Sequence, residues 1–269
     1  MRQALEAARM AGADERQQKA VLDCVIDSLK QTGLSSTPPE IGYRIHRIVR
    51  QEVGHSDPYR AAKERSTLQA LALYPRLKAL VTEADDPLEV AIRLSIAGNI
   101  IDLGLPQTYD LWETVERVLA QAFALDHGPA FRRALSSAGH ILYLADNAGE
   151  TVFDRLLVET LVAPVVYAVK GGPVLNDATL EDARAAGLDR VAQLVSTGSD
   201  APGTLLHLCS PEFRQLYDSA ELIIAKGQAN YETLSEEGQR VFLLLQTKCP
   251  VIARDLGVPT GSIVLTQGR

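Results

Sequence analysis

The sequence has few cysteines and no long apolar run. Cys24, Cys209 and Cys249 lie far apart, form no C-x-x-C pair, and are odd in number, which does not fit a disulfide framework. We therefore expect single buried thiols in a reducing compartment. No stretch approaches about 18 consecutive apolar residues, so no transmembrane helix is expected. The N-terminal stretch also lacks the apolar core of a signal peptide. These absences predict a cytoplasmic protein without a membrane partner.

Signatures of several enzyme classes are also missing. The five histidines form no H-x-x-x-H pair, and no G-x-S-x-G is present, which disfavours zincins and serine hydrolases. A P-loop is absent, and no G-x-G-x-x-G follows the first predicted strand, so nucleotide triphosphate and dinucleotide binding lack their fingerprints. The net charge of −7 argues against a nucleic-acid partner. A small anionic substrate, held by a few local cations or a metal, remains compatible with this charge.

The first half of the chain has the periodicity of helices. Apolar residues recur at three- and four-residue spacing up to about residue 135, and prolines stand near the expected helix starts at 38–39, 58 and 87. No strand-like alternation is found in this half. The 269 residues suffice for one large domain or two small ones. We predict a helical domain over residues 1–137.

The second half has a different pattern. Short, continuous apolar runs predict strands buried on both faces, with helices between several of them. The expected strands cover 140–145, 165–169, 191–195, 221–225, 241–246 and 262–266, and the expected helices 151–162, 178–187, 211–219 and about 230–239. Alternating strands and helices favour right-handed crossovers and a mainly parallel sheet. The predicted fold class is α/β, with a helical N-terminal bundle packed on a Rossmann-like, mainly parallel α/β/α domain over 138–269.

Polar residues gather where the predicted strands end. Asp146, Asn147 and Glu150 follow the first strand, and Asp177 follows the second. Because ligands bind beyond the carboxyl ends of parallel strands, these side chains are candidates for one site. Carboxylate and carboxamide oxygens suit Mg²⁺, Mn²⁺ or a similar hard cation. The alternative is that Asp146, Asn147 and Asp177 only cap the helices that follow them.

The third and fourth predicted strands end in glycine-bearing turns. Gly198 lies in "STGSDAPGT", and Lys226 precedes Gly227 in "AKGQAN". A lysine and backbone N–H groups at such turns can bind a phosphate, although Lys226 alone could be a solvated charge. Glu150 either approaches the substrate or only favours the N-terminus of the following helix.

One polar pair occurs in the helical half. Asn99 and Asp102 in "IAGNIIDLG" are three residues apart and share a helix face. This pair either contacts the backbone of another helix or lines a cleft.

Six segments, taken together, resemble a known family. They occur in order as "DPYRAAKERST", "IAGNIIDLG", "LYLADNAGETVFDRLL", "VKGGPVLNDATLEDA", "STGSDAPGT" and "IIAKGQANYETL". The set is similar to the metal-dependent damage-control phosphatases, also called the ARMT-like metal-binding family and formerly a domain of unknown function. The resemblance spans about residues 2 to 267 and is closest to the short, stand-alone prokaryotic members.

The resemblance implies an activity and a set of site residues. It implies phosphomonoester hydrolysis of small, damaged or side-product metabolites such as sugar phosphates, with a divalent metal (Mg, Mn, Co or Ni) on Asp146, Asn147 and Asp177. It further implies that Asn99 and Asp102 reach the cleft from the helical side and that Lys226, with Asn230 nearby, binds phosphate. Asp146, Asn99, Asp102 and Lys226 are thus the expected catalytic residues. Glu150, Gly198, Gly227 and Asn230 are the expected substrate or phosphate contacts.

The sequence departs from the family pattern at one point. Short prokaryotic members carry a C-x-x-C before the "RQALEAAR" segment, and this sequence has no such pair, so no role of those cysteines is carried over. A carboxyl methyltransferase activity is an alternative, which Lys170 at the end of the second strand disfavours. A non-catalytic metabolite-binding or metal-binding protein is another. The sequence does not give the physiological substrate, the native metal, the nucleophile or the oligomeric state.

Overall fold

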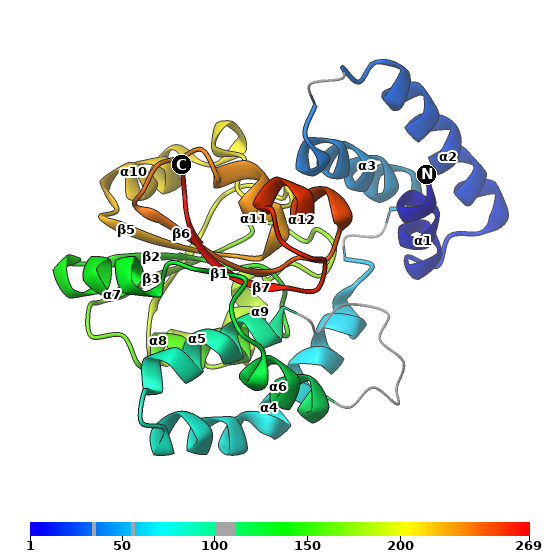
Figure 1. Cartoon of the computed structure of the whole chain (residues 1–269). Coiled ribbons are helices and arrows are strands. Elements are labelled where there is room, and N and C mark those ends of the chain that lie inside the picture. Colours follow the sequence, from blue (N-terminus) through cyan, green and yellow to red (C-terminus); the bar gives the residue numbers. More distant parts are fainter. Residues whose placement is uncertain (34–35, 55–56, 100–110) are drawn as a thin grey trace.

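The computed structural model describes residues 1–33, 36–54, 57–99 and 111–269 (Figure 1). Within these ranges the chain forms twelve α-helices, two short 3₁₀ helices and one seven-stranded sheet. The helices are α1 (Arg2–Met10), α2 (Glu15–Lys30), α3 (Pro38–Val53), α4 (Arg60–Glu83), α5 (Pro87–Gly98), α6 (Leu111–Ala120), α7 (Gly128–Ser137), α8 (Thr151–Val158), α9 (Leu180–Ala185), α10 (Pro211–Ser219), α11 (Gly227–Leu234) and α12 (Pro250–Leu256), with η1 (Leu188–Arg190) and η2 (Leu206–Leu208). The strands are β1 (Leu125–Asp126), β2 (Ile141–Leu144), β3 (Val165–Val169), β4 (Gln193–Ser196), β5 (Leu222–Lys226), β6 (Val241–Gln246) and β7 (Ile263–Gln267). The predicted fold class is confirmed.

The strand order of the sheet places a ligand site at one edge. The order is β1-β7-β6-β5-β2-β3-β4, and the neighbouring pairs are parallel except for β6 with β7. From β2 the chain runs outward through β3 to β4, and then returns to β5 on the other side of β2. The strand order therefore reverses between β2 and β5. In open α/β sheets, ligands bind beyond the carboxyl ends of the strands at such a reversal.

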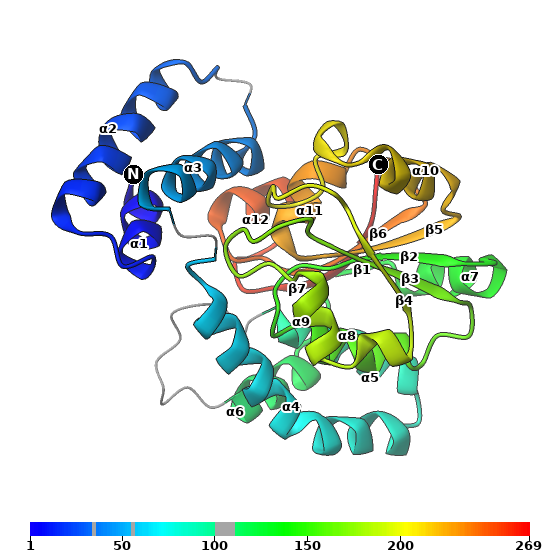
Figure 2. The ribbon, with the colours of Figure 1, turned by 180° about the vertical axis from the view of Figure 1, so that it is seen from behind.

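Both faces of the sheet are covered. Ile141 and Tyr143 of β2 belong to a hydrophobic cluster with α4, α5, α8 and α9, whereas Leu142 and Leu144 belong to a second cluster with α10, α11 and α12. Figure 1 shows the first group of helices below the sheet and the second above it, and Figure 2 shows α8 and α9 from behind, on the same side as α4 and α5. This burial on both faces explains why the strands are continuous apolar runs.

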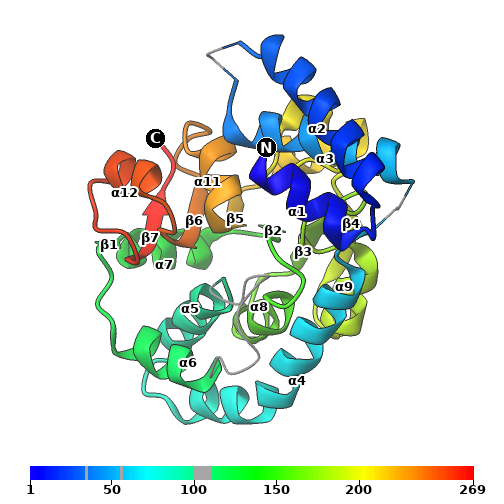
Figure 3. The same cartoon turned by 90° about the vertical axis from the view of Figure 1, so that its right-hand side faces the viewer.

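The helices that precede the sheet fall into two groups. Residues of α4, α5, α6 and α7 share one hydrophobic cluster with β2, β3, β5, β6 and β7. Gly98 of α5 lies so close to α8 that a Cβ atom there would meet the Cβ of Phe153 at 2.9 Å. Helices α1, α2 and α3 instead share a small cluster of their own, and Figure 3 shows them grouped apart from α4, α5 and α6. The division into domains at residue 137 stays a prediction.

One strand differs from the sequence expectation. Leu125 and Asp126 form a two-residue strand, β1, within the half that was predicted to hold no strand, and they pair with β7. A strand this short at the edge of a sheet is determined by its pairing with a neighbouring strand, so the sequence contains no alternating pattern that would predict it.

Among the described residues no helix is both long and apolar enough to cross a membrane.

Candidate active site at the carboxyl edge of the sheet

The turn after β2 and the loop after β3 are tied together through their backbones. The Ala178 N–H donates to the Asp146 carbonyl at 2.8 Å, and the Ala148 N–H donates to the Asn176 carbonyl at 2.8 Å. These bonds place Asn147 opposite Asp177 in an isolated antiparallel bridge. The residues predicted to share a metal therefore lie in adjacent, mutually bonded segments, at the edge where the strand order reverses.

Helix capping does not account for these polar residues. Glu150 occupies the N-cap position of α8, and no side chain caps that helix end. The N-cap of α9 is Thr179, whose N–H and hydroxyl both donate to Asp182, at 2.9 and 2.7 Å. Asp146, Asn147 and Asp177 are thus not bonded as helix caps, and their side chains lie in the site.

Asn99, at the C-terminal end of α5, reaches the same turn. Its Nδ2 donates to Asp146 Oδ2 at 2.8 Å and to Glu150 Oε1 at 2.5 Å. The Asn147 Nδ2 also donates to Glu150 Oε1, at 2.7 Å. The helical side therefore contributes Asn99 to the cluster, as predicted from the sequence. Asp102, the other predicted member of the pair, lies outside the described residues.

The carboxyl groups of the site are crowded and buried. Burial, followed by the nearby charge of Asp177, raises the pKa of Asp146 to about 7. Burial also raises the pKa of Glu150 to about 7 and that of Asp177 to about 6, although Lys226 and Lys170 respectively oppose these shifts. Such shifts mean that the ionised carboxylates lack sufficient neighbouring positive charge. A bound cation would supply it.

Two buried oxygen atoms of the site have no hydrogen-bond donor among the residues that the structure describes. Asn99 Oδ1 and Asp177 Oδ2 are both without a partner, and Lys170 Nζ lies 3.5 Å from Asp177 Oδ2, too far for a good bond. A buried acceptor without a partner is costly, so a ligand is expected to satisfy it. In the described part of the chain, no three His, Cys, Asp or Glu side chains form a metal-binding group. The available donors are carboxylate and carboxamide oxygens, which fit a hard divalent cation rather than a soft-ligand zinc site.

Lys226 lies beneath the carboxylates rather than at the surface. Its side chain is fully buried, and Nζ donates to Ser95 O at 2.9 Å, to Glu150 Oε2 at 3.1 Å and to Asp154 Oδ1 at 2.6 Å. All three ammonium hydrogens are therefore engaged within the protein. Burial alone would lower the pKa of Lys226, but the charges of Asp154 and Glu150 outweigh burial and raise it. Lys226 is thus a permanent positive charge under the site.

The glycine turns differ in what they contribute. Gly227 has φ +79°, and a Cβ atom there would lie 1.8 Å from Asp146 Oδ2, so only glycine leaves room for this carboxylate. Gly198 also has a positive φ, but its N–H donates to Ser196 Oγ at 3.0 Å. Asn230 bonds inward to the carbonyls of Ala145 and Lys226 and to the Thr204 hydroxyl. Gly227 therefore contacts the carboxylate cluster, whereas Gly198 and Asn230 are bonded to other parts of the fold.

The sequence analysis missed the residues that surround Lys226. Ser95, Tyr143, Asp154 and Tyr167 form a fully buried polar group with it. Spacing could have predicted two of them. Ser95 is four residues before Asn99, and Asp154 is four residues after Glu150, so each lies on the same helix face as a predicted site residue or on the extension of that face. The tyrosines lie in apolar strands, where nothing in the sequence marks them as polar partners.

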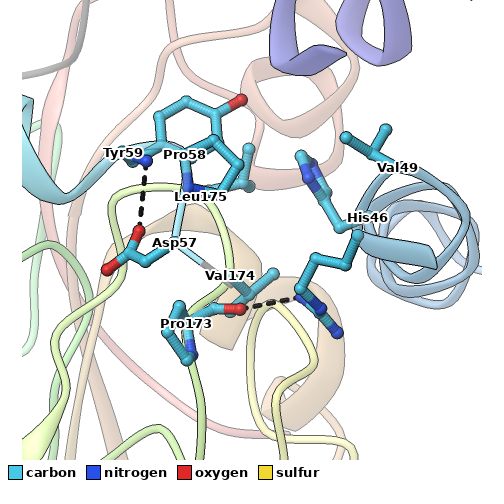
Figure 4. Close-up of a pocket in the computed structure, with 9 residues that line it drawn as sticks. His46, Val49, Asp57, Pro58, Tyr59, Pro173, Val174 and Leu175 are labelled. Atoms are coloured by element: carbon cyan, nitrogen blue, oxygen red, sulfur yellow. Dashed lines mark hydrogen bonds between the residues drawn. The ribbon is translucent and has the colours of Figure 1, made fainter. Parts of the chain in front are cut away.

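A small pocket adjoins the loop that carries Asp177. It has an empty volume of about 220 Å³, partly open to solvent, and is lined by His46, Val49, Arg50, Asp57, Pro58, Tyr59, Pro173, Val174 and Leu175. Figure 4 shows His46 and Val49 of α3 on one side of it and the loop residues Pro173, Val174 and Leu175 on another. The Arg50 guanidinium, also from α3, donates to the Pro173 carbonyl at 2.8 Å. Arg50 also forms an ion pair with Asp200. Helix α3 thereby holds the loops after β3 and β4.

The whole chain is similar to one protein family. The family model of the damage-control phosphatase ARMT1-like domain matches residues 1–264. A damage-control phosphatase of Pyrococcus horikoshii is 37% identical over 246 residues, which cover 89% of this chain and 85% of that protein. A damage-control phosphatase of Archaeoglobus fulgidus is 35% identical over 258 residues, covering 91% and 88% of the two chains.

A solved structure has the same architecture. The crystal structure of a DUF89 family protein from Pyrococcus horikoshii superposes with a TM-score of 0.90 at 32% identity. The match covers 100% of this chain and 95% of the other. The similarity therefore includes the helices before the sheet as well as the sheet itself.

Proposed function

Since the chain belongs to the damage-control phosphatase family, we propose that it is a metal-dependent hydrolase of phosphate monoesters. The expected substrates are small damaged or side-product metabolites, such as sugar phosphates, in the cytoplasm. The observation that carries the proposal is the meeting of Asp146, Asn147, Asp177 and Asn99 at the carboxyl edge of the sheet. Two buried oxygens there have no donor within the described ranges of the chain.

The metal is proposed to bind to side chains of the two tied loops. Asp146, Asn147 and Asp177 would hold it, and metal dependence is a general property of the family. A divalent cation there would act as a Lewis acid that offsets the charge developing on the transferred phosphoryl group. Mg, Mn, Co and Ni all suit the oxygen donors present.

The protein's own groups would orient the substrate and balance its charge. Asn99 would close the site from α5 with its carboxamide oxygen toward the cation, since its nitrogen already donates to Asp146 and Glu150. Asp102 is proposed to act beside it. Lys226 contributes positive charge from beneath, which favours an anionic substrate at the rim. Its direct contact with phosphate would require it to release one of its three present acceptors. The N–H at Gly227 and the turn at Gly198, with Asn230, are the proposed phosphate surroundings. Glu150 lies behind them, because both of its oxygens accept bonds within the protein.

The proposal is tested with a generic aryl phosphate in the presence of Mg²⁺, Mn²⁺, Co²⁺ or Ni²⁺. We expect Asp146→Ala and Asp177→Ala to lose metal-stimulated hydrolysis by about 10²-fold or more. Asp27→Ala, which removes an exposed carboxylate paired with Lys30 on α2, is the control and should retain full activity. Full activity in both site variants, with folding verified by circular dichroism, would refute the assignment. A panel of phosphorylated metabolites then identifies the substrate class.

The position of Lys170 disfavours the methyltransferase alternative. An S-adenosylmethionine site of the Rossmann type would need an acidic residue at the end of the strand that corresponds to β3 here. Lys170 follows β3 instead, and its ammonium donates to the Gly203 carbonyl and lies close to Asp177. Calorimetric binding of S-adenosylmethionine would revive that alternative.

A further inference from the structure

A single carboxylate holds the amide groups of two proposed site residues. Glu150 Oε1 accepts from Asn99 Nδ2 at 2.5 Å and from Asn147 Nδ2 at 2.7 Å. The two asparagines come from different elements, one from the end of α5 and one from the turn after β2. Glu150 therefore joins the helical side of the site to the sheet side.

This arrangement fixes which way each carboxamide points. Oε1 of Glu150 accepts from both carboxamide nitrogens and Oε2 accepts from Lys226, so the nitrogen of each carboxamide faces Glu150 and its oxygen faces away. Asn99 Nδ2 also donates to Asp146 Oδ2, which enforces the same orientation. Asn99 Oδ1 is accordingly buried and turned away from both carboxylates, and no described residue donates to it.

Glu150 is itself held from behind. Its second oxygen, Oε2, accepts from Lys226 Nζ at 3.1 Å, and Lys226 donates in turn to Asp154 Oδ1 at 2.6 Å. Glu150, Lys226 and Asp154 are all fully buried. Because both oxygens of Glu150 already accept bonds within the protein, this residue is not placed to bind substrate.

Asp154, at the end of this series of bonds, is held by several further donors. Its Oδ1 also accepts from Ser95 Oγ and from the Tyr143 hydroxyl, each at 2.8 Å, and its Oδ2 accepts from the Tyr167 hydroxyl at 2.7 Å. The rings of Tyr143 on β2 and Tyr167 on β3 stack with centroids 5.0 Å apart, within the hydrophobic cluster that includes α8. The carboxylate is thus satisfied by three hydroxyl groups and one ammonium group, and it cannot turn without breaking several bonds.

We propose that Glu150 is a positioning residue that turns the oxygens of Asn99 and Asn147 toward the cation, and that Lys226 and Asp154 hold Glu150 in place. The inference rests on the proposed function for the identity of the ligand, a divalent cation. Groups that orient metal ligands in this way typically change metal affinity about 10–100-fold when they are removed. Glu150 would then act on metal affinity without touching metal or substrate.

The test measures Mn²⁺ affinity by isothermal titration calorimetry, without any substrate. We expect Glu150→Gln to weaken Mn²⁺ binding by about 10–100-fold, since the Gln amide adds a donor where two amide nitrogens need an acceptor. We also expect a smaller loss from Glu150→Gln when Asn99 is already alanine, because part of the effect of Glu150 passes through Asn99. If the losses of affinity in the two single variants multiply, to within about twofold, to the loss in the double variant, the two residues act independently. That result would contradict the inference.

Glu159→Gln is the matched control. Glu159 lies at the C-terminal end of α8 and accepts from Tyr74, Lys78 and Arg155, so the variant loses comparable bonds outside the site. It should retain the Mn²⁺ affinity of the unaltered protein. If Glu150→Gln does not fold, Tyr167→Phe removes one donor to Asp154 and keeps the ring, and weaker Mn²⁺ binding is still expected.

The outcomes separate the inference from the proposed function. Equal Mn²⁺ affinity in the unaltered protein and in Glu150→Gln, or in Tyr167→Phe where that variant must be used, overturns the inference alone. Absence of Mn²⁺ binding by the unaltered protein overturns both the inference and the metal assignment.

Discussion

At the scale of single residues, Gly227 determines whether Asp146 can occupy the site. The residue has φ +79°, and any side chain would begin where Asp146 Oδ2 lies. Several other glycines also have a positive φ, which would strain any other residue there. Gly227 differs from them because the Asp146 carboxylate occupies the space that a Cβ atom would need.

We predict that Gly227→Ala abolishes divalent metal binding and metal-dependent hydrolysis. The added Cβ would displace the Asp146 carboxylate, in addition to about 1–2 kcal/mol of strain from the positive φ. Gly257→Ala is the control, because Gly257 has φ +69° and no atom lies within 4 Å of the point that its Cβ would occupy, so it experiences the strain without the contact. Both variants should lose stability in urea unfolding, and only Gly227→Ala should lose Mn²⁺ affinity. Equal Mn²⁺ affinity in the two variants would contradict the prediction.

His46 makes the stability of the protein depend on pH. Burial, followed by the charge of Arg50, lowers the pKa of His46 to about 4. Its Nε2 has no hydrogen-bond partner in the part of the chain that the structure describes. An unfolded histidine has a pKa near 6.5, so between about pH 4 and 6.5 the unfolded chain binds the additional proton. This residue therefore makes the free energy of unfolding rise with pH across that window.

The prediction is a comparison of urea unfolding at pH 5.0 and 7.5. His46→Gln removes the titrating group, so the gain in unfolding free energy between the two pH values should be smaller in the variant by about 2 kcal/mol. An identical pH dependence in the variant and the unaltered protein would show that His46 is not buried in its neutral form.

At the scale of elements, a buried lysine joins α4 to α9. Lys63 Nζ lies 2.9 Å from Asp57 and 3.0 Å from Asp182, and its side chain is 3% exposed. Asp182 also accepts two bonds from Thr179, the N-cap residue of α9. This N-cap, two residues after Asp177, is thus held in place by a helix from the N-terminal half.

Removing this cation should destabilise the protein strongly. Lys63→Met leaves two partly buried carboxylates without their partner, and we expect a loss of about 3–5 kcal/mol in the free energy of unfolding. Lys19→Met, which breaks an exposed pair with Asp23 on α2, should leave stability nearly unchanged. Similar small effects of the two substitutions would indicate that the carboxylates at 57 and 182 find other partners.

At the scale of the whole molecule, a metal that binds only the folded chain must stabilise all of it. At a free concentration about 100 times its dissociation constant, such a ligand adds about 2.7 kcal/mol to the free energy of unfolding. For a chain of this size we predict a rise in Tm of roughly 5–10 °C on adding Mn²⁺, measured by differential scanning calorimetry. Chelation should reverse the rise. Persistence of the full rise in Asp146→Ala or Asp177→Ala would place the metal elsewhere.

The sequence predicts the sheet better than it predicts the surroundings of the site. Asp146, Asn147 and Asp177 could be placed together because the carboxyl ends of parallel strands meet at one edge. Lys226 could be assigned to that edge, but not its partners, because Ser95 and Asp154 reach it from two helices whose packing no local pattern specifies. The strand at Leu125 is too short for any periodicity. Such features depend on contacts between residues far apart in the chain.

Leu175 connects the loop that carries Asp177 to a hydrophobic cluster outside the proposed site. Its φ of 47° is the one positive value at a non-glycine residue in the described ranges, and its side chain packs against the hydrophobic cluster of α1, α2 and α3. The position of Asp177, two residues later, therefore depends on the packing of helices that contribute no proposed metal ligand. Substitutions within that cluster would therefore move the Asp177 carboxylate while every proposed metal ligand stays the same.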